Sequence, residues 1–264
     1  MKTTLVTGAS SGIGEAFARK LAAAGANVLL VARSEDKLIR LCSELGRANK
    51  IKAQYVALDL TARDAPSRLF DETMQRDLQV ELLVNNAGFG SMGDFLMLDL
   101  GSELQMIDLN IRSLVELTHV FLAPMRARKN GAIINVASTA AFQPVPFMAT
   151  YAATKAFVLS FSEALWEENR VFGIKVMALC PGVTETNFFN AAHVNKPPLR
   201  SAQTPEEVVD AALKGLRRGR SHIISGWTNY LLAESERLVP RSLIARIIGR
   251  ALRPTFEETV IGDK

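Results

Sequence analysis

The feature that most constrains the fold is a regular alternation of short apolar runs with longer amphipathic stretches. The runs are nearly continuous in apolar or β-branched residues, as strands are when helices cover both faces of their sheet. Strands that alternate with helices form βαβ units with right-handed crossovers. We therefore predict an α/β protein with a doubly wound parallel sheet. Its seven strands are expected at Thr3–Thr7, Asn27–Ala32, Lys52–Leu58, Glu81–Val84, Ala132–Val136, Lys175–Leu179 and His222–Ile224.

The stretches between these runs have helical periodicity. One helix is predicted over Ser102–Arg128 and another over Ala149–Phe172. Ser34, followed by two acids, is expected to cap a further helix that Gly46 ends, because serine favours the N-cap and glycine the position after the last turn. Thr204, followed by proline and two glutamates, predicts another helix start.

Composition narrows the class of protein. Of the 264 residues, 48% are hydrophobic and 22% are charged, which excludes global disorder and supplies one sizeable core. A net charge of +4 does not indicate a nucleic-acid binder. Cys42 and Cys180 cannot make a disulfide framework and lack metal-ligand spacing, so we expect a cytoplasmic protein with no bound metal. No apolar run reaches membrane-spanning length.

The chain is predicted to be a single domain with an extension at its C-terminal end. Residues 1–225 hold all the predicted strands and all the functional motifs described below. The least regular segment, residues 184–203, contains two adjacent prolines and is interpreted as a lid. Residues 226–264 are longer than such a fold needs and form the extension.

The extension is basic and amphipathic. Residues 237–253 contain five arginines and no acid, and their apolar residues share one helical face between Pro240 and Pro254. Three interpretations stay open. The segment packs onto the body or a second subunit, it contacts an anionic membrane surface peripherally, or it is a solvated end.

A glycine-rich turn follows the first predicted strand and opens the first helix. Glycines there permit positive φ angles and let backbone N–H groups approach a pyrophosphate, while the helix N-terminus adds a positive dipole. Two serines supply hydroxyl donors. An ordinary turn is the alternative, but the position between a strand and a helix favours phosphate binding. The residues concerned are Gly8, Ser10, Ser11, Gly12, Ile13 and Gly14.

The end of the second strand bears on which dinucleotide binds. An acid there would hold the ribose 2′-hydroxyl of NAD, whereas an arginine accommodates the 2′-phosphate of NADP. Ala32 stands where the acid is expected and Arg33 follows it, so NADP(H) is predicted in preference to NAD(H). In the alternative interpretation, Arg33 is a surface charge that pairs with Glu35 or Asp36.

Three residues suggest proton chemistry. Tyr151 and Lys155 are four residues apart, so they share one face of the predicted helix. A tyrosine pKa near 10 is too high for a base at neutral pH, and a neighbouring ammonium is expected to lower it. Ser138 follows a predicted strand, at the edge where open α/β sheets bind ligands, and its hydroxyl can hydrogen-bond a carbonyl oxygen.

Two clusters of polar or small residues fit the same site. The segment Asn85–Gly88 follows a strand, where small residues and amides could let a cofactor approach the backbone; an ordinary turn is the alternative. Asn110 lies in a predicted helix although asparagine is a poor helix former. It is therefore either a surface amide or a polar group inside the site.

Together these motifs resemble the single-domain branch of the short-chain dehydrogenase/reductase family, which has a Rossmann-type fold. The resemblance covers about residues 1–225. It rests on Thr7-Gly8-x-x-x-Gly12-Ile13-Gly14, Asp59-Leu60, Asn85-Asn86-Ala87-Gly88, Asn110, Ser138, Tyr151-x-x-x-Lys155 and Pro181-Gly182-x-Thr184-x-Thr186.

The resemblance implies a role for each position. Tyr151 is implied as the general acid/base, and Lys155 lowers its pKa and holds the nicotinamide ribose. Ser138 orients the substrate oxygen, and Asn110 supports a water-linked proton relay to Lys155. The further implied cofactor contacts are Asp59, next to Leu60, beside the adenine; Asn86, Ala87 and Gly88 along the cofactor; and Pro181, Gly182, Val183, Thr184 and Thr186 on the nicotinamide side.

The predicted function is NADP(H)-dependent interconversion of a carbonyl and an alcohol on an apolar small molecule. The aromatic residues expected to border the substrate are Phe89, Phe142, Phe147 and Phe188, although they could instead pack against the lid. A 3-oxoacyl-thioester reductase and a hydroxysteroid dehydrogenase are alternatives, and an NADP-binding sensor or scaffold is the non-enzymatic one. The resemblance also implies a homodimer or homotetramer.

Overall fold

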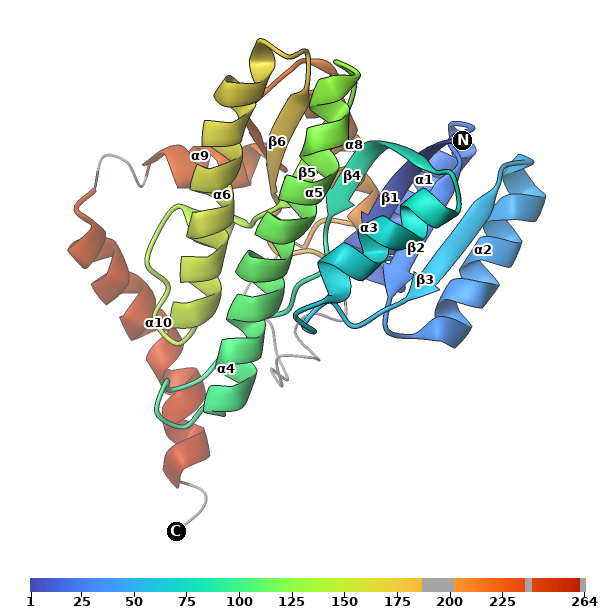
Figure 1. The fold of residues 1–264 in the computed structure, drawn as a ribbon. Coiled ribbons are helices and arrows are strands. Elements are labelled where there is room, and N and C mark those ends of the chain that lie inside the picture. The colour runs from blue at the N-terminus through green and yellow to red at the C-terminus, as the bar shows by residue number, and fades with distance from the viewer. Residues whose placement is uncertain (187–201, 236–238, 262–264) are drawn as a thin grey trace.

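Seven parallel strands form one open sheet with helices on both faces (Figure 1). The computed structural model describes residues 1–186, 202–235 and 239–261, with side chains as far as Arg253. The strand order is β3-β2-β1-β4-β5-β6-β7. The predicted doubly wound sheet and its seven strands are confirmed, with ends that shift by one or two residues. The strands are β1 (Lys2–Thr7), β2 (Val28–Ala32), β3 (Ala53–Ala57), β4 (Gln79–Asn85), β5 (Ala132–Val136), β6 (Lys175–Cys180) and β7 (His222–Ile224).

The helices form two layers, one on each face of the sheet. Buried Phe17, Leu38 and Val208 belong to the core on one face, under α1, α2 and α8. Buried Leu69 and Phe121 belong to the core on the other face, under α3, α5 and α6, which lie in front of the sheet in Figure 1. The helices are α1 (Gly12–Ala23), α2 (Glu35–Asn49), α3 (Ala65–Gln75), α4 (Leu100–Ile107), α5 (Leu114–Ala127), α6 (Ala149–Arg170), α8 (Pro205–Arg217), α9 (Trp227–Ser235) and α10 (Arg241–Ile261).

The helix predicted over Ser102–Arg128 is interrupted. A π-helical segment, η1 (Asp108–Ser113), separates α4 from α5. Asn110 lies inside this segment with 1% of its surface exposed, so it is not a surface amide. The π-helical turns carry no sequence signal of their own, and such segments occur often at functional sites.

The three helix boundaries predicted at Thr204, Ser34 and Gly46 have different outcomes. Thr204 caps α8 as predicted: its hydroxyl accepts from Glu207 N, and the Glu207 carboxylate accepts from Thr204 N. Ser34 occupies the N-cap of α2, but its side chain makes no capping hydrogen bond. Gly46 was expected to end α2, and this is wrong. The helix continues to Asn49 because Lys50, with φ of 55°, takes the left-handed position that closes it.

The C-terminal extension packs on the body. Ile248 and buried Leu252 of α10 contact a cluster that includes Met92 and Phe147, in agreement with the first interpretation of this segment. Pro254 does not end α10, which runs to Ile261; a proline removes one helical hydrogen bond without stopping a helix that is held elsewhere. Among the described residues, no helix is long and apolar enough to cross a bilayer.

Most of the predicted lid, residues 187–201, lies outside the described residues. Its two ends are described, and they meet. Thr184 and Gln203 form a parallel bridge, in which Glu185 N donates to Gln203 O over 2.9 Å and Gln203 N donates to Val183 O over 2.9 Å. The two described ends of the predicted lid therefore lie side by side, after the carboxyl end of β6.

Candidate active site

A cleft of about 370 Å³ opens where the strand order reverses between β1 and β4. Open α/β sheets bind ligands at this point, beyond the carboxyl ends of the strands. The cleft brings together residues at the ends of the five strands β1 to β5, residues of α4, η1 and α6, and Thr186 after β6. Those singled out from the sequence are Gly8, Ser10, Ser11, Gly12, Ile13, Arg33, Asp59, Leu60, Asn86, Ala87, Gly88, Phe89, Tyr151, Lys155 and Thr186.

The glycine turn leaves no room for side chains. Gly8 and Gly12 have φ of +64° and +56°, which favour glycine. A Cβ on Gly14 would lie 2.3 Å from Gly8 O, and one on Gly12 would lie 2.9 Å from Thr186 Cγ2. The hydroxyls of Ser10 and Ser11 have no hydrogen-bond partner among the described residues. The backbone and these hydroxyls thus face the cleft at the N-terminus of α1.

Hydrogen bonds from Thr7 and Asn86 hold this turn in place. The Thr7 hydroxyl accepts hydrogen bonds from the backbone N of Asn86 and of Ala87, both at 3.0 Å, and donates to Val84 O. Asn86 Nδ2 donates to Thr7 O over 2.9 Å and to Gly8 O over 3.3 Å. The two strand ends β1 and β4 are therefore locked together under the cleft.

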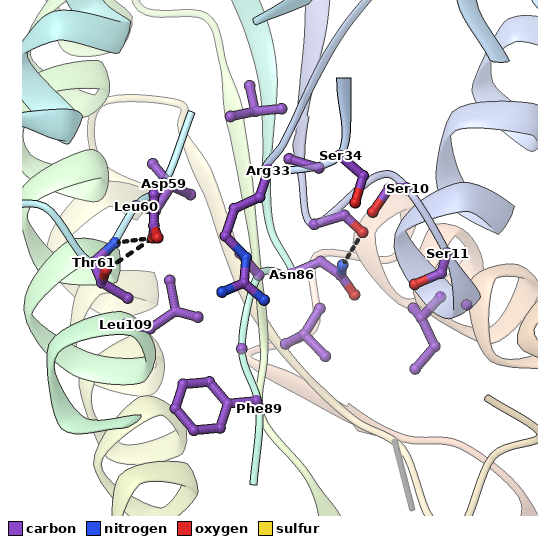
Figure 2. Close-up of a pocket in the computed structure, with 18 of the residues that line it drawn as sticks. Ser10, Ser11, Arg33, Ser34, Asp59, Leu60, Thr61, Asn86, Phe89 and Leu109 are labelled. Atoms are coloured by element: carbon purple, nitrogen blue, oxygen red, sulfur yellow. Dashed lines mark hydrogen bonds between the residues drawn. The ribbon is translucent and has the colours of Figure 1, made fainter. Parts of the chain in front are cut away.

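Arg33 and Tyr151 line opposite ends of the cleft. Arg33 follows β2, and Tyr151 lies on α6, which follows β5. Figure 2 shows its guanidinium extending into the cleft, in the view between Asp59 and Asn86. Within the part of the chain that the structure describes, Arg33 makes no hydrogen bond or ion pair. The expected alternative partner Glu35 instead accepts from the Tyr55 hydroxyl. The guanidinium is thus available to a ligand.

Asp59 is held beside it. Its Oδ1 accepts from Thr61 N at 2.9 Å and from Thr61 Oγ1 at 2.8 Å (Figure 2). Partial burial raises the pKa of Asp59, but the Thr61 hydrogen bonds and the Arg33 charge outweigh it and leave that pKa below its ordinary value. The carboxylate is therefore charged at neutral pH and fixed in orientation.

Ser138, Tyr151 and Lys155 meet between β5 and the first turn of α6. The hydroxyls of Ser138 and Tyr151 are hydrogen-bonded to each other. Lys155 Nζ donates to Val136 O over 2.8 Å and lies 5.7 Å from the Tyr151 ring centroid. Tyr151 and Lys155 are 9% and 5% exposed. The two hydroxyls together can hold one carbonyl oxygen, with a buried cation nearby.

The acid–base properties differ from the sequence prediction. Burial raises the pKa of Tyr151 to about 12, against the opposing effect of the Ser138 hydrogen bond. Burial lowers the pKa of Lys155 to about 8. The expectation that the Tyr151 pKa lies below its ordinary value is wrong in this arrangement, because desolvation of the phenolate outweighs the effects that lower the pKa. Tyr151 is accordingly protonated at neutral pH and suited to donate a proton.

Asn110 acts as a clamp rather than lining the cleft. Its Nδ2 donates to Phe89 O over 3.0 Å and to Thr154 Oγ1 over 3.1 Å, and its Oδ1 accepts from Phe89 N. A Cβ on Gly88 would lie 2.7 Å from Asn110 Oδ1 and 3.5 Å from Lys155 Nζ. Asn110 thus ties the loop after β4 to α6, next to Lys155.

Several predicted residues lie elsewhere. Ser138 and Gly14 support the cleft walls without lining them. In the segment Pro181, Gly182, Val183 and Thr184, none lines the cleft, and a Cβ on Gly182 would lie 2.3 Å from Asn229 of α9. Phe142 packs towards His222, with ring centroids 6.1 Å apart. Phe147 lines a separate groove, and Phe188 lies outside the described residues.

Sequence reasoning missed residues of two kinds. Positions at or just after strand ends also line the cleft, and only their place near a strand end could have signalled them: Val31, Ser34, Leu58, Thr61 and Val136. Gln105 of α4 and Leu109 of η1 line it too, and no sequence signal marked them. A buried polar ladder was missed as well. Asn85 Nδ2 donates to Asn135 Oδ1 over 2.9 Å, and Asn135 Nδ2 donates to Ser162 Oγ over 2.9 Å. It joins β4, β5 and α6 beneath the site.

Comparisons with known proteins agree on one family. The model of the short chain dehydrogenase family matches residues 2–196. A very-long-chain 3-oxoacyl-CoA reductase of Macaca fascicularis is 35% identical over 233 residues, which cover 84% of this chain and 73% of that protein.

Two solved structures are similar to this one. A short-chain dehydrogenase from Sphingobium yanoikuyae in complex with NADPH has a TM-score of 0.82 and 31% identity, covering 90% of this chain and 94% of its own. A bulky-bulky ketone specific alcohol dehydrogenase from Comamonas testosteroni has a TM-score of 0.77 and 31% identity, covering 90% of this chain and 92% of its own.

Proposed function

This chain belongs to the short-chain dehydrogenase family of oxidoreductases, and from that premise we propose that it uses NADP(H) to reduce a carbonyl of an apolar substrate to an alcohol, or to run the reverse reaction. The observation that carries the proposal is that Tyr151, hydrogen-bonded to Ser138, and Lys155 line a cleft that is also lined by the glycine turn and Arg33.

The residues present fit a dinucleotide. The turn at Gly8, Gly12 and Gly14 offers backbone where any Cβ would clash, and the hydroxyls of Ser10 and Ser11 beside it have no hydrogen-bond partner within the described part of the chain. Arg33 offers a guanidinium with no ion pair among the described residues, and Ala32 places no acid at the end of β2. This arrangement supports NADP(H) over NAD(H), since arginine binds phosphate in a bidentate manner.

The protein's own groups account for the proton. When bound, the cofactor supplies or accepts the hydride. Ser138 and Tyr151 would hydrogen-bond the carbonyl oxygen, and the phenol would donate its proton as negative charge develops there. The charged Lys155 would stabilise the phenolate that remains. Tyr151 and Lys155 are buried, so their charges interact more strongly than they would in water.

A 3-oxoacyl thioester is the second candidate substrate. The similarity to a very-long-chain 3-oxoacyl-CoA reductase favours it. A steroid ketone is a further possibility within the same chemistry. A sensor or scaffold role is less well supported, because Ser138, Tyr151 and Lys155 are all present, and the last two are buried together.

A substrate and cofactor panel tests the proposal. Simple apolar ketones, 3-oxoacyl thioesters and hydroxysteroids, each with NADPH and with NADH, are followed by the absorbance of the reduced nicotinamide. The account expects oxidation of NADPH with at least one carbonyl class, faster than with NADH. Binding of NADPH without turnover of any carbonyl or alcohol would favour the sensor role instead.

Assembly and location are proposed on separate grounds. Exposed Leu104 and Ile107 of α4 and Phe157 of α6 support a homodimer or homotetramer through these helices, which light scattering on the purified protein tests. The free, buried thiols of Cys42 and Cys180 support a cytoplasmic setting. We propose that residues 1–225 form the dinucleotide-binding and catalytic domain and that residues 226–264 extend it. Contact of residues 237–253 with an anionic membrane stays a prediction. Co-sedimentation of the protein with anionic vesicles would test it.

A further inference from the structure

A second cavity, a groove of about 550 Å³, lies between α10 and two loops of the body. One wall comes from residues 93–98 after β4, and another from residues 146–149, which lead into α6. The third wall is the face of α10 over residues 245–253. Phe95, Leu98 and Phe147 make much of the lining apolar.

The three walls are held together. Gly93 N donates to Phe147 O over 2.8 Å, which joins the two loops. Gly249 brings α10 close to them, since a Cβ there would meet Pro146 Cγ at 3.5 Å. Leu252, 9% exposed, packs with Met92 at the floor. The groove is therefore a formed feature of the fold.

One rim of this groove is positively charged. Arg246 and Arg250 both line it, one helical turn apart on α10. Neither makes a hydrogen bond or an ion pair with any residue whose side chain the structure describes. Arg253 lines the groove as well. Asp94 is the one acid among the residues that line it, and its Oδ1 accepts from Leu96 N. The groove thus combines an apolar lining with a surplus of guanidinium groups, which bind phosphate well.

The groove and the cleft are lined from the same two segments. The loop after β4 gives Phe89 to the cleft and residues 93–98 to the groove. The start of α6 gives Ala149 to the groove and Tyr151 to the cleft, and residues two apart on a helix point to different sides of it. A substrate with its carbonyl at Tyr151 would reach the groove by passing around the first turn of α6.

We propose that this groove binds the phosphate-bearing pantetheine arm of a coenzyme A thioester, with Arg246 and Arg250 on its phosphates. The inference rests on the proposed function and narrows its substrate to an acyl thioester. A neutral apolar ketone would use the apolar lining but would leave both guanidiniums without a partner. Coenzyme A presents several phosphates beyond a long uncharged arm, which matches an apolar groove with a basic rim.

The test compares two substrates that differ in their phosphates. KM is measured with NADPH for a medium-chain 3-oxoacyl-CoA and for the same acyl group on pantetheine. The double variant Arg246→Gln/Arg250→Gln is expected to raise KM for the coenzyme A thioester by about tenfold, as charge-assisted contacts are lost. KM for the pantetheine thioester is expected to change less than twofold. Arg241→Gln, on α10 but outside the groove, serves as the matched control and should alter neither KM.

A binding measurement separates this inference from the proposed function. Calorimetry with coenzyme A alone should show binding to the wild type and to Arg241→Gln, and weaker binding to the double variant. Reduction of ketones and pantetheine thioesters without any preference for coenzyme A, or equal effects of the double variant on both thioesters, would overturn the groove proposal and leave the proposed function standing. If no carbonyl of any class is reduced, the proposed function fails, and calorimetry still decides whether the groove binds coenzyme A.

Discussion

Lys155 directs its ammonium to the carbonyl oxygen of Val136, 2.8 Å away, at the end of β5. This contact keeps the cation buried beside the Tyr151 ring instead of extended into solvent. A buried ammonium with one backbone partner loses charge more readily than one in water, in agreement with its pKa of about 8.

The pH dependence of reduction follows from these two groups. Lys155 is charged below its pKa of about 8 and loses that charge as the pH rises, whereas Tyr151, with a pKa of about 12, keeps its proton throughout. We expect kcat/KM for reduction to be flat below about pH 7 and to fall above about pH 8. In Lys155→Arg, the descending limb should move to higher pH, because guanidinium does not deprotonate. An unchanged limb in that variant would show that another group titrates.

Arg33 is expected to decide the choice of cofactor. Arg33→Gln should raise KM for NADPH by about tenfold or more and leave KM for NADH nearly unchanged, because only NADPH carries the 2′-phosphate. Arg40→Gln, an exposed arginine of α2 outside the cleft, is the control. If both cofactors weaken equally in Arg33→Gln, the side chain has a general role and the proposed selectivity is wrong.

Two glycines in helices should respond in opposite ways to alanine. Gly14→Ala places a Cβ 2.3 Å from Gly8 O, so it should destabilise the fold by about 1–3 kcal/mol and weaken NADPH binding. Gly46→Ala lies in α2 with its nearest contact at 3.6 Å and should stabilise it by about 0.5–1 kcal/mol. Chemical denaturation and a cofactor titration measure both effects, and a Gly14→Ala protein with wild-type stability and affinity would contradict the account of the turn.

Asn110 should act on the substrate side of the site. Asn110→Ala removes three hydrogen bonds that hold Phe89 and Thr154, and the groups left buried cost about 1–3 kcal/mol of stability. We expect a higher KM for the carbonyl substrate with NADPH affinity largely kept. Asn130→Ala, which loses one surface hydrogen bond to Glu81, is the control. A selective loss of NADPH binding in Asn110→Ala would argue against the clamp.

Sequence periodicity was sufficient for the sheet because its central strands are buried on both faces. The glycine turn could also be located, since Gly8, Gly12 and Gly14 are needed where backbone approaches backbone. The places of residues that pack between segments far apart in the sequence could not be predicted. Phe147, with φ of 64°, turns into the α10 groove, and Phe142 faces His222. The pKa of Tyr151 depends on burial more than on its neighbour four residues away, which spacing alone does not reveal.

The most direct test of the central claim is the rate of NADPH-dependent carbonyl reduction by Tyr151→Phe. The variant keeps the ring and loses only the proton donor, so kcat should fall by about 10²- to 10⁴-fold while NADPH still binds, as a fluorescence titration would show. Tyr55→Phe, which loses only a surface hydrogen bond to Glu35, should keep full activity. A Tyr151→Phe enzyme that reduces the same carbonyl at the wild-type rate would contradict the claim.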